Sequence, residues 1–265
     1  MADNVYAGAC AAAAGFGVAI APEEPAAVAE RGGFGKGELE AVAAVFDYLG
    51  QRHEEHAVET PLRLSGLPRT APKTFDSFDF SRTRGRDAAA LRALPELTNL
   101  YPRKNVAFIG PGGIGKTHLA QAYGRECCLR GHKTSYIKAT ELRDRLRTAA
   151  DSGDPSMAVS ALVRPSCLIV DEVGSCTFDR ERTDLFFDVV DRRYEKEGPD
   201  TLILASNTQA NNWDQFFAGD ETLLCALERI FDRASVFVMR GPSFRGAGLD
   251  TFSVEAKPAV VRDKR

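Results

Sequence analysis

A glycine-rich segment from Gly110 to Thr117 holds the residues with the clearest chemical purpose. It reads Gly-Pro-Gly-Gly-Ile-Gly-Lys-Thr and fits the phosphate-binding pattern G-x-x-x-x-G-K-[ST]. Glycines let backbone N–H groups curl around phosphate oxygens, because no Cβ stands in the way. Lys116 is expected to reach the β- and γ-phosphates of ATP, and Thr117 to offer its hydroxyl to Mg²⁺. The predicted nucleotide-binding residues of this segment are Gly110, Pro111, Gly112, Gly113, Ile114, Gly115, Lys116, Thr117 and the adjoining His118.

Two carboxylates follow an apolar run further along the chain. The run Cys167–Val170 leads directly into Asp171 and Glu172. A buried strand that ends in two acids indicates a nearby cation, because desolvating carboxylates is costly. We expect Asp171 to lie in the outer shell of Mg²⁺ and Glu172 to activate the attacking water. The second acid favours ATP hydrolysis over simple kinase chemistry. Two acids at a merely solvated strand end are the alternative interpretation.

A third polar residue follows another apolar run, Leu202–Ala205. Asn207 stands two residues beyond this run and could orient the attacking water or contact the γ-phosphate. The alternative is a turn or helix-capping asparagine before Thr208. A phosphate loop, an acidic pair and a polar sensor, each at a strand tip, are together typical of ring-type ATPases. His118 is expected to pack beside the helix start, and we assign it no catalytic role.

These residues must be positioned by alternating strands and helices. Apolar runs predict buried strands at residues 106–109, 134–137, 167–170, 201–205 and 236–239. Amphipathic patterns predict helices at residues 117–130, 140–149, 182–196 and 221–231. Strands that alternate with helices indicate a parallel sheet covered on both faces. We therefore predict an α/β protein: a three-layer α/β/α P-loop domain with a parallel five-stranded sheet.

The chain divides into four predicted parts. Residues 1–35 are rich in Ala, Gly and Pro and are expected to be flexible or loosely helical at best. Residues 36–73 form a small helical segment, one helix or a short pair, followed by a linker. Residues 74–245 form the ATPase domain, which begins with a phenylalanine-containing strap at 74–80. Residues 246–265 form a C-terminal tail.

Composition narrows the class of protein further. The net charge is −3, so any DNA contact must come from local basic patches or from repetition across an oligomer. Six cysteines occur without a C-x-x-C pair, which argues against a zinc cluster. The apolar run near the N-terminus lacks the basic residues of a signal peptide, and no stretch has the length of a membrane span. We expect a cytoplasmic protein.

Six segments together resemble the IstB-like ATPases: residues 105–120, 168–174, 185–195, 204–207, 227–230 and 241–245. The most specific features are His118 after the P-loop threonine, the Leu-Phe-Phe…Arg-Arg-Tyr helix and the closing Gly-Pro-Ser-Phe-Arg. The resemblance covers about residues 74–245. It implies an AAA+ domain with a minimal or absent lid, which assists a transposase of a bacterial insertion sequence. It also implies kinship with the DnaC helicase loaders. Residues 1–35 depart from the family, whose members carry a more regularly helical and charged N-terminal region.

The same resemblance implies two arginine roles. Arg229 matches the arginine finger that reaches the γ-phosphate of a neighbouring subunit, and Arg245 matches an arginine that senses nucleotide in its own subunit. A guanidinium suits both roles, because it is always charged and forks onto phosphate oxygens. A surface helix charge and a solvated turn residue are the respective alternatives, and Arg192 or Arg193 is a weaker candidate finger. A finger in trans implies a homo-oligomer with an ATP-bridged interface.

Three functions from different classes follow from these features. The favoured one is an Mg²⁺-dependent ATPase that assembles on duplex DNA and assists a transposase. The second is a replicative helicase loader, which a neighbouring replication gene rather than a transposase gene would indicate. The third is a small-molecule P-loop kinase, for which a mobile arginine-rich lid is missing. Candidate DNA contacts are Lys138 and the run Arg143–Arg147, with a solvated helix face as the alternative.

Overall fold

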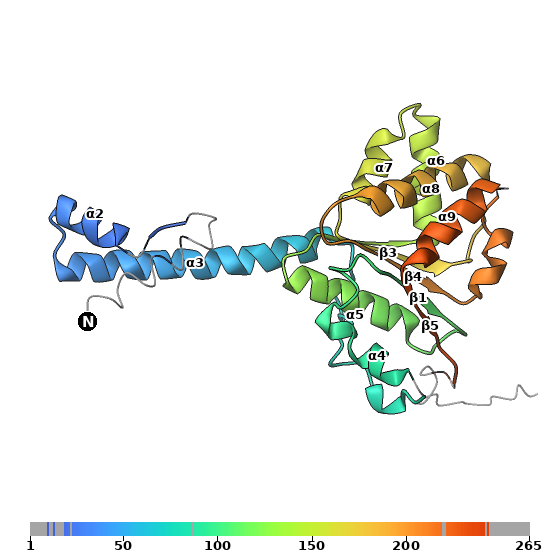
Figure 1. Ribbon diagram of the computed structural model, residues 1–265, viewed down its shortest axis with the longest axis horizontal. Coiled ribbons are helices and arrows are strands. Elements are labelled where there is room, and N and C mark those ends of the chain that lie inside the picture. Colours follow the sequence, from blue (N-terminus) through green and yellow to red (C-terminus); the bar gives the residue numbers. More distant parts are fainter. Residues whose placement is uncertain are drawn as a thin grey trace, which may run out of the picture.

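A parallel five-stranded sheet forms the centre of the structure, a computed structural model (Figure 1). The strand order is β2-β3-β4-β1-β5, and every neighbouring pair is parallel. The strands are β1 (Asn105–Ile109), β2 (Thr134–Lys138), β3 (Cys167–Val173), β4 (Thr201–Ser206) and β5 (Ala234–Val238). The predicted fold class is confirmed. The structure describes Cys10, Ala13, residues 19–21, 23–85, 87–218, 221–241 and Ser243.

Strand β3 extends three residues further than the apolar run predicts. It continues through Asp171 and Glu172 to Val173, and its register with β4 shifts between Val170 and Val173. Glu172 occupies the left-handed region there, with φ of 59°. This irregularity lets the two consecutive acids leave the regular alternation of the strand.

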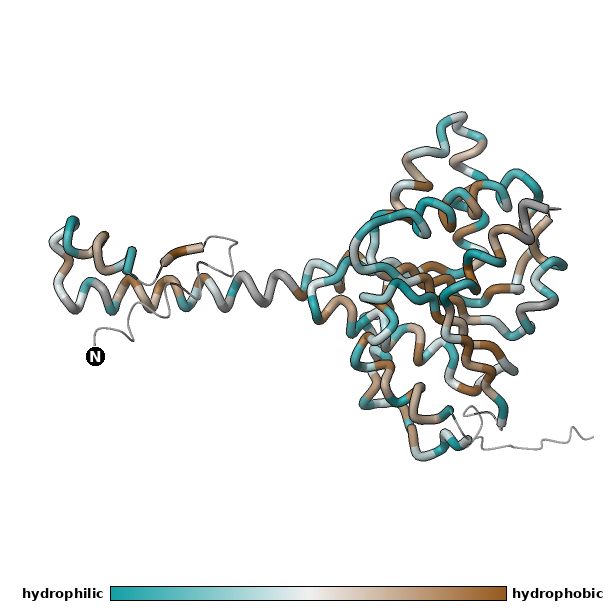
Figure 2. The backbone as a smooth tube through the Cα atoms, viewed as in Figure 1, coloured by the Kyte–Doolittle hydropathy of each residue, from teal (hydrophilic) through white to brown (hydrophobic). Residues whose placement is uncertain are grey.

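Helices cover both faces of the sheet and complete the three layers. On one face lies α5 (Lys116–Leu129), and on the other lie four helices: α6 (Ala139–Asp151), α7 (Ser156–Val163), α8 (Arg180–Glu195) and α9 (Glu221–Asp232). Side chains of alternate β3 residues point to opposite faces of the sheet: Ile169 packs in the core under α5, and Leu168 packs in the core under the other helices. Figure 2 shows the hydrophobic residues gathered along the strands. Helix α7 was not predicted, because its eight mostly apolar residues show no clear helical period.

A helical arm projects from the domain at its N-terminal side (Figure 1). It consists of α2 (Glu24–Gly32) and α3 (Lys36–Leu64). Helix α3 is continuous over 29 residues, about 44 Å at 1.5 Å per residue. Apolar side chains on its outer part are exposed, among them Val45 at 56% and Leu49 at 44%. Helix α2 lies within residues 1–35, which the sequence predicts to be flexible or loosely helical at best. The boundaries of the four predicted parts stay predictions. No helix in the described part of the chain is both long and apolar enough to cross a membrane.

The phenylalanine-containing strap lies against α5. Phe75 and Phe78 are buried and pack in the same hydrophobic cluster as Leu119 and Tyr123 of α5, with Phe80 partly buried beside them. Three short helices follow the strap and continue this cover: η1 (Phe80–Arg82), α4 (Ala88–Arg92) and η2 (Leu94–Glu96). The strap therefore leads the chain past the first turn of α5, where the phosphate loop ends.

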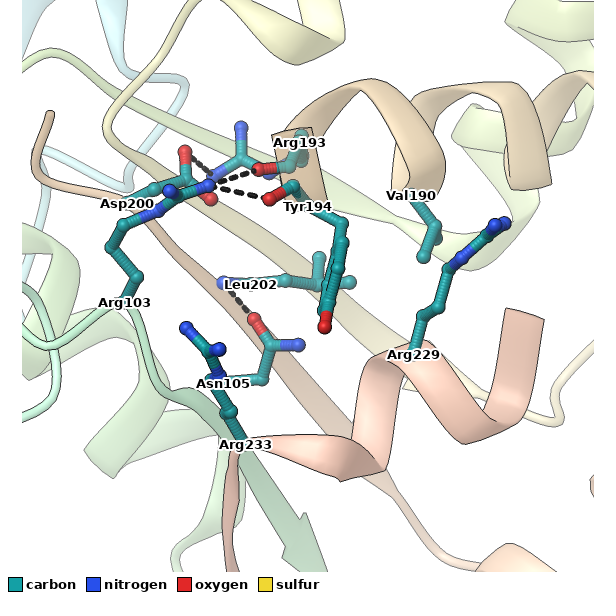
Figure 3. A pocket seen from close by; sticks show the side chains of 9 residues that line it. All are labelled: Arg103, Asn105, Val190, Arg193, Tyr194, Asp200, Leu202, Arg229 and Arg233. Atoms are coloured by element: carbon teal, nitrogen blue, oxygen red, sulfur yellow. Dashed lines mark hydrogen bonds and ion pairs between the residues drawn. The ribbon is translucent and has the colours of Figure 1, made fainter. Parts of the chain in front are cut away.

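A buried arginine joins helices α7 and α8 to the start of β4. Arg193 is 3% exposed and pairs with Asp200 at 2.9 Å, which also pairs with Lys196 at 2.9 Å. Figure 3 shows this ion pair beside Arg103. The Arg193 guanidinium also donates hydrogen bonds to five backbone carbonyls, those of Leu162, Val163, Pro165, Ser166 and Thr201.

Replacing Arg193 with methionine should lower the free energy of unfolding by about 3 kcal/mol, because it leaves buried carbonyls without donors and weakens the pairing of a buried Asp200. Urea unfolding followed by circular dichroism measures the change. Arg192→Met is the matched control, since Arg192 lies one position earlier and is exposed, and its effect should stay within about 0.5 kcal/mol. Equal effects of the two substitutions would contradict the structural role of Arg193.

Candidate nucleotide-binding site

The phosphate loop connects the end of β1 to the first turn of α5. Gly110, Gly113 and Gly115 have φ values of 153°, 80° and 91°, which side chains rarely adopt. A Cβ on Gly115 would lie 2.6 Å from the ring of Phe78, so the strap packs directly on the loop. The loop also opens onto the N-terminus of α5, whose positive dipole end favours an anion.

Lys116 joins two of the three predicted strand tips. Its side chain is buried, and its ammonium donates to the carbonyl of Pro111 and to Oδ1 of Asn207, both at 2.7 Å. Asn207 itself is exposed just beyond β4. The sequence-predicted sensor and P-loop lysine are therefore in direct contact. An ammonium that donates to neutral oxygens such as these can exchange them for the charged oxygens of a phosphate, which are stronger acceptors.

Asp171 is 2% exposed and accepts hydrogen bonds at both carboxylate oxygens. Oδ1 accepts from the Thr117 hydroxyl at 3.1 Å and from the Glu172 N–H at 2.9 Å. Oδ2 accepts from the Tyr136 hydroxyl at 2.8 Å. A buried carboxylate beside a threonine hydroxyl is the oxygen donor set that Mg²⁺ prefers, so these residues fit the predicted metal.

Tyr136 is a part of the site that the sequence did not indicate. Burial raises the pKa of its hydroxyl well above the ordinary value, and the negative charge of Asp171 raises it further. The hydroxyl therefore stays protonated and acts as a donor to Asp171. No sequence pattern reveals this pair, because it depends on the register that sets Lys138 beside Asp171 across β2 and β3.

Glu172 points away from the interior and pairs with a lysine. Its Oε1 lies 3.0 Å from Nζ of Lys138, and both side chains are more than 40% exposed. The ion pair with Glu172 raises the pKa of Lys138. Lys138, one of the candidate DNA contacts, thus lies against the residue predicted to activate water. The ion pair therefore engages an oxygen of the carboxylate that we predict to act on the attacking water.

His118 fastens the strap to the phosphate-loop helix. Its Nε2 lies 2.8 Å from the carbonyl of Thr74 and 3.2 Å from the hydroxyl of Ser77. Its ring meets the ring of Phe78 edge to face. Burial lowers the pKa of His118, so the imidazole is neutral near pH 7. Packing beside the helix start is what the sequence led us to expect for this residue.

A cleft adjoins the phosphate loop between the strap and the end of β5. Its lining is mixed: Phe78, Leu91, Ile114 and Met239 are apolar, whereas Arg82, Arg84, Asp87 and Arg240 are charged. No sequence motif indicated a pocket here. The strap is the sequence feature that could have indicated this cleft, because three phenylalanines in a polar linker before a P-loop suggest a segment folded over the site.

Arg229 lies at the opposite end of the sheet from the phosphate loop. The carbonyl of the next residue, Ile230, accepts from the Asn105 side chain at 2.8 Å, at the start of β1. The loop follows Ile109, four residue steps and about 13 Å further along β1. Arg229 pairs with Asp191 on α8, and both side chains are over 40% exposed.

The other arginines named from the sequence differ in their settings. Arg193 is buried in a structural network, which excludes it as a finger. Arg192 is exposed and pairs with Asp188 at 2.8 Å. Arg245 lies outside the described residues. Arg233 follows α9 and lines the same polar pocket as Arg229, together with Arg103 (Figure 3).

Comparison with known sequences identifies close kin of this chain. The model of the family described as IstB-like ATP-binding protein matches residues 36–248. The ATP-binding protein assigned to insertion sequence IS5376 of Geobacillus stearothermophilus is 36% identical over 193 residues, which cover 72% of this chain and 74% of that protein. Its counterpart from insertion sequence IS21 of Pseudomonas aeruginosa is 33% identical over 195 residues, which cover 73% and 71%.

Solved structures show the same fold. The DnaC helicase loader aligns with a TM-score of 0.51 and 18% identity, over 63% of this chain and 97% of that one. The protein DnaI aligns with a TM-score of 0.55 and 17% identity, over 72% of this chain and 100% of that one. AMPPCP-bound DnaA from Aquifex aeolicus aligns with a TM-score of 0.51 and 22% identity, over 65% and 51%. At these identities the likeness establishes the AAA+ fold.

Replacing His118 with alanine should loosen the strap and weaken ATP binding about fivefold, since a lost hydrogen bond of about 1 kcal/mol has that effect on an equilibrium. Binding of a fluorescent ATP analogue measures the affinity, and limited proteolysis within residues 74–80 reports the strap. His132→Ala is the control, because His132 is also half-buried near the other end of α5. Unchanged cleavage of the strap in His118→Ala would contradict its fastening role.

Proposed function

The chain belongs to the IstB-like ATP-binding protein family, and we propose that it hydrolyses ATP between neighbouring subunits on duplex DNA to assist a transposase. The observation that carries this proposal is the separation of Arg229 from the phosphate loop of its own subunit. Arg229 is exposed on α9 near the start of β1, whereas the loop follows the other end of that strand, which is about 13 Å long; this placement suits an ATP held by a neighbour. Its charge would then stabilise the γ-phosphate as it leaves.

In this proposal each residue at the carboxyl ends of the strands has one task. The loop residues and Lys116 bind the phosphates, and Asn207 orients the water. Glu172 accepts a proton from the water as its oxygen attacks the γ-phosphorus and the bond to the β-phosphate oxygen breaks. Thr117 and Asp171 would hold Mg²⁺, which supplies neutralisation of the phosphate charge.

The cleft beside Ile114 is the place we propose for the adenine base. It adjoins the phosphate loop, and its aromatic and aliphatic walls, Phe78 and Met239 among them, suit a flat ring. Because His118 holds the strap that carries Phe78, the base and phosphate sites share one support. Arg245 remains our candidate for nucleotide sensing within the subunit.

The proposed partners are duplex DNA, further copies of this chain and a transposase. Support for a transposase comes from relatives at 36% and 33% identity that are assigned to insertion sequences. The helicase-loader alternative rests on a likeness of fold alone, at 17–18% identity. Co-purification with a transposase encoded beside this gene, rather than with a replicative helicase, distinguishes the two.

We expect duplex DNA to stimulate ATP hydrolysis, and Arg229→Ala to remove the stimulation while ATP binding survives, because the finger acts on a neighbour's nucleotide. Phosphate release with and without long duplex DNA measures the rate, and Glu172→Gln should abolish hydrolysis. Arg192→Ala is the matched control, since Arg192 is also exposed and paired with an aspartate.

Mixing two inactive variants tests whether the finger acts in trans. Lys116→Ala lacks a working phosphate loop, and Arg229→Ala lacks the finger. In a mixed assembly, some interfaces combine the intact loop of an Arg229→Ala subunit with the intact finger of a Lys116→Ala subunit. Hydrolysis should return in the mixture. A hydrolysis rate that changes neither with DNA nor with the Arg229 substitution would contradict the intersubunit mechanism. A mixture that stays inactive would contradict it too.

Removing the partner of Glu172 should raise hydrolysis in the absence of DNA. Lys138→Met frees the carboxylate from its ion pair, and we expect the basal rate to rise several-fold because Oε1 of Glu172 can then hydrogen-bond the attacking water. The same phosphate-release assay measures it. Lys133→Met, which removes an exposed lysine at the opposite end of β2, is the control. A basal rate that falls in Lys138→Met would mean that Lys138 itself binds the nucleotide or the DNA needed for activity.

A further inference from the structure

Tyr136 occupies a junction between the buried carboxylate and the helical arm. Its side-chain hydroxyl donates to Oδ2 of Asp171 at 2.8 Å. The donors from Thr117 and Glu172 both bind Oδ1. Within the described residues, Tyr136 therefore provides the hydrogen bond that fixes the second oxygen and so the rotation of the carboxylate plane.

The backbone of Tyr136 touches the root of the arm. Strand β2 is an edge strand, and its outer side is met by the chain that leaves α3. The Tyr136 N–H donates to the carbonyl of Ser65 at 2.7 Å. Gly66 follows with φ of 75°, and a Cβ there would lie 2.8 Å from the carbonyl oxygen of Tyr136. The arm root is thus in contact with Tyr136 on both its N–H and its carbonyl.

The root itself is firmly held. Ser65 is 1% exposed, its hydroxyl donates to the carbonyl of Leu62 at 2.8 Å and it accepts from the N–H of Leu67 at 3.1 Å. Leu62 and Leu67 pack in the core under α5. Helix α3 therefore leads directly into residues 65–66 and their contact with β2, and no loose linker intervenes.

We propose that Tyr136 is a positioning residue that orients Asp171 for Mg²⁺ and couples this carboxylate to the helical arm. The proposal rests on the function proposed above, in which Thr117 and Asp171 hold the metal. A donor to a metal-binding carboxylate fixes its direction, and removing such a partner weakens metal affinity. Any movement of the arm root shifts Tyr136 and thereby the oxygen that Tyr136 holds.

The test compares full-length Tyr136→Phe with the unaltered protein in binding of a fluorescent ATP analogue. Without Mg²⁺, in EDTA, the affinity should be unchanged, because the phosphate loop is intact. The Mg²⁺ concentration that gives half of the metal-dependent gain in affinity should rise about tenfold. Tyr101→Phe is the control, since Tyr101 is exposed and its hydroxyl meets His132 instead.

Asp171→Asn separates failure of this inference from failure of the proposed metal site. A shift in Asp171→Asn without one in Tyr136→Phe overturns the role of Tyr136 and leaves the metal site intact. No shift in either variant overturns the proposed metal site and the inference with it. Affinity that falls equally with and without Mg²⁺ in Tyr136→Phe also overturns the inference, because it means a general structural role.

Coupling to the arm is tested by a matched pair of glycines. Gly66→Ala adds a methyl group against the Tyr136 carbonyl, whereas Gly131→Ala adds one in open space at nearly the same φ, 77°. Both substitutions carry the same backbone strain. We expect the Mg²⁺ requirement to rise in Gly66→Ala and to stay unchanged in Gly131→Ala. Equal behaviour of the two variants overturns the coupling.

Discussion

The buried carboxylate of Asp171 is the interaction on which the rest of the site depends. Removing a carboxylate from water costs several kcal/mol unless donors replace the lost hydration. Here the donors come from three elements: the first turn of α5, the edge strand β2 and the next residue of β3 itself. The hydrogen bonds of the Asp171 carboxylate therefore require β2 to lie beside β3 and the phosphate-loop helix to lie above the ends of both strands.

Adjacent acids acquire opposite roles because β3 breaks its regular ladder between them. The shift in register and the positive φ of Glu172 turn that residue's N–H onto Asp171 and its side chain toward solvent. Asp171 is 2% exposed, whereas the Glu172 side chain is 45% exposed. A left-handed non-glycine residue costs about 1–2 kcal/mol. The hydrogen bond that it makes to a buried charge offsets that cost.

Structural features encoded in contiguous segments could be predicted from the sequence, whereas contacts that depend on strand register could not. The P-loop, the acidic pair and the alternation of strands and helices that supports them follow from local composition, so the fold class was predictable. Tyr136 reads only as one residue of an apolar strand, because its partner lies 35 positions away across β2 and β3. Arg192 and Arg193 look alike in sequence, yet one is exposed and the other buried. Their difference is set by helix α7, which sequence reasoning also missed.

Charge pairing on the candidate DNA face explains why assembly and DNA binding would depend on each other. Lys138 lies beside Glu172, and Arg143 lies beside Asp144, so these two cations already have carboxylate partners. A DNA phosphate must displace the carboxylate. The binding free energy gained per contact is then only the small difference between two exposed ion pairs. With a net charge of −3, a single subunit gains little from DNA. In the proposed ATP-bridged oligomer, repetition would multiply these weak contacts, and displacement at Lys138 would free Glu172.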